Sequence, residues 1–158
     1  VFVVLDDQLV FPYMGTSGIA PSGHRGMYTG GSIGLATLRR DGFASMDGPG
    51  ELTTRPVKFS GKHLFVNSVG EMSVVVRDES GTVLATSRPH AGDATKHRIE
   101  WVGIADLSAF AGKPIRFSFS LGSGSLYSFW VTPDENGASG GYVGAGGPAF
   151  NGVRDTSH

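Results

Sequence analysis

Apolar and polar residues alternate in short runs along most of this chain, which is the pattern of β-strands. In residues 115–121 the alternation is complete, with Ile, Phe, Phe and Leu on one side and Arg and Ser on the other, so one side of this segment is expected to face solvent. Residues 126–131 are apolar on both sides, as in a central or covered strand. Strand signals recur at residues 33–40, 51–57, 63–69, 72–77, 82–87, 97–102, 115–121 and 126–131.

Glycine-containing segments separate these runs. Residues 47–50, 70–71, 79–81 and 122–125 are expected to form turns, because glycine adopts positive φ without strain. The chain therefore predicts eight or more antiparallel strands. Two antiparallel sheets packed face to face account for this number of strands, and we expect an all-β, jelly-roll-like β-sandwich.

The two ends of the chain differ from its middle. Residues 1–13 read as a hairpin around Asp6-Asp7, and residues 15–32, rich in Gly, Ser, Pro and Thr, as a long loop. Only residues 104–111 have helical spacing, sufficient for one or two turns that Asp106 can cap. The expected domains are a sandwich at 1–132, of which 1–32 are the hairpin and loop, and a Gly-rich irregular tail at 133–158.

The two tryptophans have different expected environments. Trp101 ends an alternating apolar pattern and is expected in the core. The surroundings of Trp130 stay open, since either Tyr127 with Phe129 or Leu126 with Trp130 can face the second sheet.

Composition narrows the functional classes. The chain has 158 residues, enough for one ordinary domain, and 25 glycines, typical of many tight turns. Its 13 basic and 14 acidic residues give a formal charge of −1, which argues against nucleic acid or an anionic membrane surface as a partner. There is no cysteine, so disulfides and thiolate sites are excluded. No apolar run approaches the roughly 18 residues that a membrane-spanning helix needs.

Catalytic and cofactor motifs are not found. The chain has no Gly-x-Ser-x-Gly, no His-Glu-x-x-His and no phosphate-binding loop. His90, Asp93 and His97 are zinc-type ligands in one polar stretch, but their spacing matches no zinc motif and we expect a solvated loop leading into a strand. Asp41, Asp47 and Glu51 flank a turn and could hold a structural calcium ion, the one cofactor that the sequence raises.

Aromatic side chains are the remaining candidates for ligand contact, because exposed rings stack on the apolar face of a sugar. Tyr28 in the long loop is such a candidate, and the strand end after that loop adds polar groups. The candidate carbohydrate-binding residues are Tyr28, Arg39, Arg40, Asp41 and Trp130. For the Arg-Arg-Asp segment, a surface turn with a local ion pair is favoured over a binding site.

Three stretches together resemble a known family. They are residues 30–46 (GGSIGLATLRRDGFASM), residues 52–57 (LTTRPV) with 61–67 (GKHLFVN), and residues 126–131 (LYSFWV). This combination resembles the C-terminal β-sandwich of glycosidase-like proteins whose main body is a five-bladed β-propeller, relatives of the invertase and arabinanase clans. The resemblance implies that residues 7–11 are similar to a strand of the last propeller blade. It also favours an extracellular or periplasmic location.

No catalytic residue follows from this resemblance, because propeller glycosidases take their carboxylates from blades for which this chain has no room. We therefore expect a non-catalytic accessory module, structural or carbohydrate-binding, whose partner is carbohydrate or a propeller domain. The alternative is an interaction or assembly protein that forms homo-oligomers through an exposed sheet edge.

Overall fold

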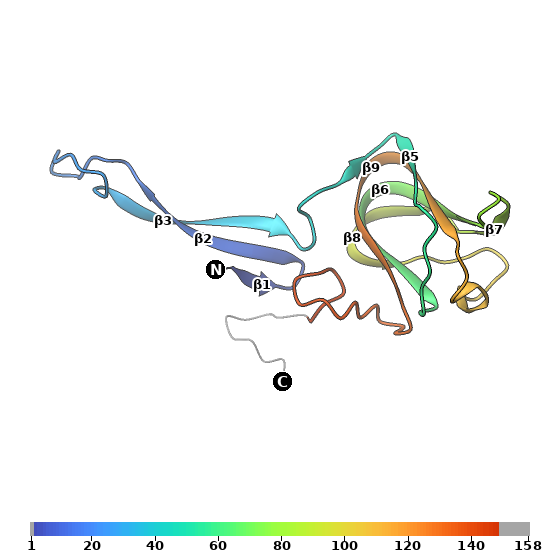
Figure 1. Ribbon diagram of the computed structural model, residues 1–158. Helices are drawn as coiled ribbons and strands as arrows, with labels where there is room; N and C mark the ends of the chain where they lie inside the picture. The colour runs from blue at the N-terminus through green and yellow to red at the C-terminus, as the bar shows by residue number, and fades with distance from the viewer. Residues whose placement is uncertain (1, 149–158) are drawn as a thin grey trace. The chain divides into compact units, whose positions relative to one another are not determined.

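The computed structural model describes residues 2–148, whose regular secondary structure is antiparallel β-sheet apart from one short 3₁₀ turn (Figure 1). The described residues form two compact units, a ribbon unit at 2–40 and a sandwich unit at 41–148. The boundary thus follows Arg40, eight residues beyond the predicted end of the N-terminal loop. No helix in the described part of the chain is long and apolar enough to cross a membrane.

The ribbon unit is a three-stranded antiparallel sheet in the order β1-β2-β3. β1 (Val3–Leu5) and β2 (Gln8–Thr16) pair across a two-residue turn at Asp6-Asp7, as predicted. β3 (Gly31–Arg39) pairs with β2 along its whole length. The predicted loop at 15–32 is therefore slightly shorter, since both strands extend into it.

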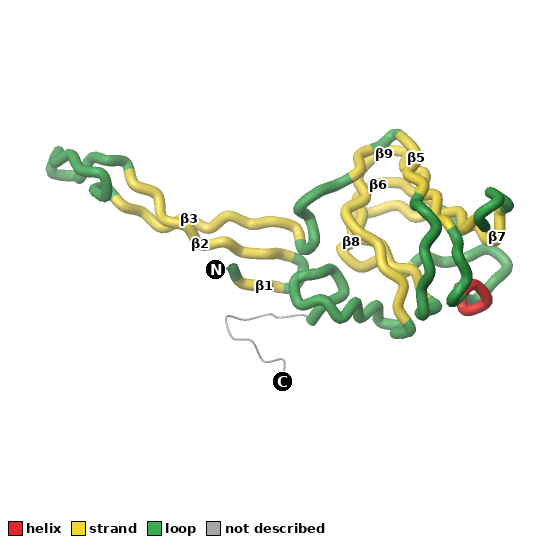
Figure 2. The backbone as a smooth tube through the Cα atoms, in the orientation of Figure 1, coloured by secondary structure: helices red, strands yellow, loops and turns green. Residues whose placement is uncertain are grey.

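The sandwich unit contains one six-stranded sheet built on two long central strands, β6 and β9. β4 and β5 pair with the outer edge of β9, and β7 and β8 pair with the outer edge of β6. Both central strands curve strongly (Figures 1 and 2). The strands are β4 (Met46–Asp47), β5 (Gly50–Thr53), β6 (His63–Arg77), β7 (Val83–Thr86), β8 (His90–Arg98) and β9 (Arg116–Thr132).

A row of glycines crosses this sheet where it bends. Gly92 of β8 pairs with Gly70 of β6, which pairs with Gly124 of β9, and the three have φ of 132°, 90° and 112°. Gly48, between β4 and β5, continues the row by donating its N–H to the Gly124 carbonyl at 2.9 Å. We call this row the crease. A Cβ at Gly124 would overlap the Val69 carbonyl oxygen, so the close approach of β6 and β9 requires glycine there.

Folding at the crease makes the structure β-sandwich-like, because the two halves of one sheet enclose one core. Leu64 and Val66 from one half of β6 belong to the same buried cluster as Val74 and Val76 from the other half. Rings from the two halves of β9 also meet: Phe119 and Phe129 have centroids 4.8 Å apart. The core is thus formed mainly by β6 and β9 packing against themselves.

Three sequence predictions are corrected by these strands. The turns predicted at 70–71 and 122–125 are absent, because the glycines there bend continuous strands instead of reversing the chain. The solvated loop predicted for the stretch around His90 and His97 is strand β8. The strand predicted at 97–102 ends at Arg98, after which Trp101 forms an isolated bridge with Ser87.

The tryptophan environments are now defined. Trp101 is buried, as predicted, with 6% of its surface exposed. On β9, Asn67 pairs with Ser128 and Ser68 with Leu126, which leaves Tyr127 as the extra residue of a bulge. The bulge breaks the alternation, so Leu126 and Phe129 both join the core. One residue from each of the two predicted pairs, Tyr127 with Phe129 and Leu126 with Trp130, therefore faces the core.

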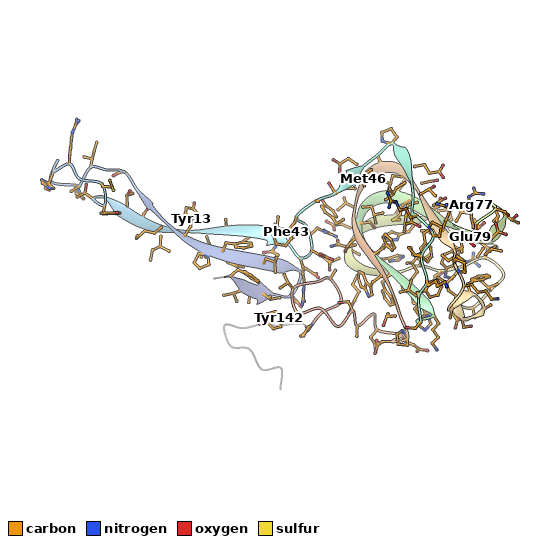
Figure 3. The ribbon with its side chains drawn as sticks, viewed as in Figure 1. Tyr13, Phe43, Met46, Arg77, Glu79 and Tyr142 are labelled. Carbon is orange, nitrogen blue, oxygen red and sulfur yellow. The ribbon has the colours of Figure 1, made fainter. Side chains whose placement is uncertain are left out.

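The remaining helical signal gives a single 3₁₀ turn, η1 (Ser108–Phe110), where the Asp106 carboxylate accepts the Ser108 N–H at 2.9 Å. The β6–β7 hairpin carries Arg77 and Glu79 (Figure 3), and the Arg77 Nη1 donates to the Gly81 carbonyl at 3.1 Å.

Residues 133–148 of the predicted tail belong to the sandwich unit. Its residues 149–158 lie outside the described residues.

Candidate functional site

A cleft of about 490 Å³ lies beside the crease in the sandwich unit. We call it the crease cleft. Three strands supply its walls: β6, β9 and the start of β8. Its lining residues are Glu71, Met72, Ser73, Pro89, His90, Ala91, Ser120, Leu121 and Gly122. Its volume is within the usual range of small-molecule sites.

The polar groups of the crease cleft have free hydrogen-bonding capacity. Ser73 and Ser120 are opposite each other on β6 and β9. A Cβ at Gly122 would lie 3.4 Å from the Glu71 Oε2 atom, so the carboxylate reaches over the bare backbone of β9. Among the described residues, the side chains of Glu71, Ser73 and Ser120 have no hydrogen-bond or ion-pair partner. The His90 Nε2 atom is buried and likewise has no partner there.

His90 also stacks on His97. Their ring centroids are 3.4 Å apart with 18° between the planes, although both residues belong to β8, because this strand also bends at the crease. Burial lowers the pKa of His90. Burial, and then the neighbouring His90, lower the pKa of His97, while Glu100 opposes this. Both shifts favour the neutral imidazole, and the face-to-face arrangement of the rings directs their in-plane nitrogens away from a shared metal position.

Two other clefts of the sandwich unit are less suited to binding a polar ligand. One, of about 380 Å³, is lined mainly by apolar side chains of β4, β5 and β9, including Met46 (Figure 3). The other, of about 370 Å³, has Arg88, Arg98 and Glu100 around Trp101. There the Arg88 Nε and Glu100 Oε2 atoms form an exposed ion pair at 3.8 Å, so one of the two cations is already partly neutralised.

The candidate sugar-binding residues on the ribbon unit have separate environments. Tyr28 is 79% exposed in the loop between β2 and β3. Arg39 ends β3. Arg40 is only 3% exposed, and its Nη1 donates to the Asp6 carbonyl at 3.1 Å. The Arg40 guanidinium therefore braces the β1–β2 turn and is not on an open surface.

In the sandwich unit, Asp41 has a positive φ of 57°. The Trp130 ring stacks on Phe65 at 5.7 Å, and its Nε1 donates to the Gly137 carbonyl at 3.1 Å. One face of the indole and its only donor are therefore used inside the protein. Neither Asp41 nor Trp130 lines the crease cleft.

Two of the three candidate calcium ligands, Asp47 and Glu51, are engaged with hydroxyl groups. Asp47 Oδ1 accepts from Ser125 at 2.6 Å and from Ser45 at 2.8 Å, and these bonds, Ser125 first, lower the pKa of Asp47. Glu51 Oε1 accepts from Thr53 at 3.3 Å. Within residues 2–148, no three His, Cys, Asp or Glu side chains gather in a way that could hold a metal ion.

Sequence reasoning did not identify the residues of the crease cleft as a site. The sequence predicts a turn at Glu71 and a loop at His90, and Ser73 and Ser120 look like the polar positions of ordinary strands. Their proximity results from the bend at the crease. Comparison with protein-family models, with curated proteins and with solved structures finds no match for this chain.

Proposed function

We propose that this chain is a non-catalytic β-sandwich accessory module of a carbohydrate-active protein, with a jelly-roll-like arrangement and an extracellular or periplasmic location. The observation that carries the proposal is the crease cleft, where Glu71, Ser73 and Ser120 present unpartnered oxygen atoms from a rigid sheet. Oxygen acceptors and donors on a rigid frame are what recognition of sugar hydroxyls requires. The resemblance of residues 30–46 and 126–131 to the sandwich of propeller glycosidases supports the same assignment.

The same cleft supports a binding role over catalysis. Glycoside hydrolysis ordinarily uses two carboxyl groups that flank the scissile bond. Of the described residues that line the crease cleft, Glu71 is the only acidic one. A single carboxylate can orient a sugar, but it cannot act as both general acid and nucleophile or base.

A glycan array probed with the full chain tests this function. We expect retention on one class of plant or marine polysaccharide, and no release of reducing sugar during prolonged incubation with that polysaccharide. A blank array would contradict the binding role, and turnover would contradict the non-catalytic role. Tyr28→Ala serves as a second probe of the array, because this exposed ring could add a stacking contact.

A second candidate function, assembly, is favoured by the surface of the ribbon unit. Met14 and Ile33 are opposite each other on β2 and β3, and are 72% and 83% exposed; Leu35, on the same face, is 68% exposed. Tyr13 of β2 (Figure 3) is on the other face, where its ring lies over Gly34 of β3. β3 pairs only with β2 among the described strands, and Arg39 is its one charged residue. Edge strands of monomeric proteins usually carry more charged residues, prolines or bulges that prevent pairing with another chain.

Light scattering of the full chain tests assembly. A mass above the 16.5 kDa of one chain is expected, and Leu35→Lys is expected to reduce it. Ser32→Lys, on the opposite face of the same strand, is the matched control. A strict monomer at every concentration would rule this candidate out.

A further inference from the structure

We propose that the crease cleft binds one or two rings of a neutral saccharide, with Glu71, Ser73 and Ser120 as the hydroxyl-binding groups. This inference rests on the proposed function and adds to it the location of the site and the class of ligand. It also moves the expected sugar contacts away from Arg40, which is 3% exposed, and from Trp130, whose Nε1 donates to the Gly137 carbonyl.

The polar groups of the crease cleft match the hydroxyls of a sugar. The Glu71 carboxylate accepts hydrogen bonds only, whereas each serine hydroxyl can donate and accept. Ser73 and Ser120 are cross-strand partners, so their side chains lie on the same face of the sheet. None of the three side chains has a partner among the described residues, so a ligand displaces no internal side-chain hydrogen bond when it binds.

Apolar groups beside them suit the C–H surface of a pyranose ring. Pro89, Ala91 and Leu121 line the same cleft. Gly122 exposes bare backbone next to the Glu71 carboxylate, which leaves space for a ring at this point. Apolar lining with a few directed polar groups is the general composition of small-ligand sites.

The charge of the cleft argues against an anionic ligand. The ionisable groups that line the cleft are Glu71 from β6 and His90 from β8, while the β9 residues there are Ser120, Leu121 and Gly122. No Lys or Arg among the described residues lines the cleft, and burial lowers the pKa of His90, so at neutral pH the cleft offers no cation to a carboxylate or sulfate group. The Glu71 carboxylate repels such groups. Uronic acids and sulfated sugars are therefore disfavoured.

The experiment begins with the wild-type chain on an array that holds neutral, uronic-acid and sulfated oligosaccharides, followed by titration calorimetry with the strongest neutral oligosaccharide retained. Glu71→Gln and Ser120→Val are then titrated with that oligosaccharide. Each is expected to weaken binding by roughly 10-fold or more, as for the loss of a hydrogen bond to a charged or directed group. Glu51→Gln, an exposed carboxylate on β5 outside the cleft, is the matched control and is expected to bind as the wild type does.

Circular dichroism melts first confirm that each variant is folded, and backbone amide chemical shifts locate the ligand. The amides of Ser73, Ala91 and Gly122 are expected to move on titration. The cleft site is overturned if Glu71→Gln and Ser120→Val bind the oligosaccharide as tightly as the wild type does. It is also overturned if the amide chemical shifts change only at other residues. In both cases the sugar-binding role itself is retained. Retention of acidic glycans alone overturns the choice of a neutral ligand. A blank array overturns both this inference and the binding role on which it rests.

Discussion

The rings of Phe119 and Phe129 lie with their centroids 4.8 Å apart, although both residues belong to strand β9. In a straight strand, which rises about 3.3 Å per residue, they would be about 33 Å apart. The contact therefore shows how far β9 folds back on itself. Each half of the strand belongs to a different layer, and the crease between them is the feature on which both the core and the candidate site depend.

Replacing Gly124 with alanine is expected to destabilise the protein severely. The new Cβ would overlap the Val69 carbonyl oxygen, and φ is 112° at this position. We expect a loss of about 4 kcal/mol or more in the free energy of unfolding, measured by urea denaturation. Gly92→Ala is the matched control, since φ is 132° there but no atom lies within 4 Å of the added Cβ. It is expected to cost only about 1–3 kcal/mol, and equal losses in the two variants would argue against a close approach at Gly124.

The position of Gly124 also explains why the sequence predicts turns at points where β6 and β9 are continuous. Gly-rich segments at the end of an apolar run normally mark turns, and the expectation of separate strands followed from this rule. Positive φ is compatible both with chain reversal and with a sharp bend. The chain bends instead of reversing when the segments before and after the glycine pair with the same neighbouring strand. β6 and β9 remain paired through the crease, and no local signal reports this.

Trp101→Ala is expected to cost about 3–5 kcal/mol of stability, because Trp101 is 6% exposed and part of the core cluster. The measurement is urea denaturation followed by circular dichroism. Val102→Ala, at the next position and 57% exposed, is expected to change stability by less than about 0.5 kcal/mol. A small effect of Trp101→Ala would mean that the core does not depend on this ring.

Stability is expected to fall as the pH decreases below 6.5. Burial is the main cause that lowers the pKa of His63, His90 and His97 from the ordinary 6.5. Because the folded pKa is lower, the unfolded chain binds more protons in this range, and the histidines' contribution is present above 6.5 and lost as the pH falls through the folded values. Urea midpoints from about pH 8 down to about pH 5 measure this before most carboxylates titrate.

His97→Gln separates this effect from other titrations. It removes one of the two stacked rings and is expected to flatten the dependence of the urea midpoint on pH, whatever it does to stability at high pH. The same slope in the wild type and the variant would show that the stacked pair does not contribute to the acid sensitivity.

Calcium is expected to leave the melting temperature unchanged. Asp47 and Glu51 are engaged with hydroxyl donors, and residues 2–148 contain no cluster of three ligating side chains. A site filled at 100 times its dissociation constant would add about 2.7 kcal/mol of stability, which a melting scan in calcium and in EGTA detects readily. If calcium raised the melting temperature and Asp47→Asn abolished that increase, the result would support the calcium site predicted from the sequence.

The candidate site was less accessible to sequence reasoning than the fold. All-β structure, the β1–β2 hairpin and the burial of Trp101 follow from local alternation and turn chemistry, and the structure agrees with each. The crease cleft joins Glu71, His90 and Ser120, which come from three strands and meet only because the sheet folds. Nothing in the residues near any one of them indicates the other two. Trp130 stayed open for a related reason, because the bulge at Tyr127 changes which side chains face the core.

The pairing of β6 with β9 has a consequence for how the sandwich unit forms. These strands, His63–Arg77 and Arg116–Thr132, are far apart in the sequence and supply residues to both layers. Contacts of such long sequence separation slow folding, because a large loop must close before they form. Neither layer can be completed without this strand pair, so the unit is expected to gain and lose its two layers in one cooperative transition.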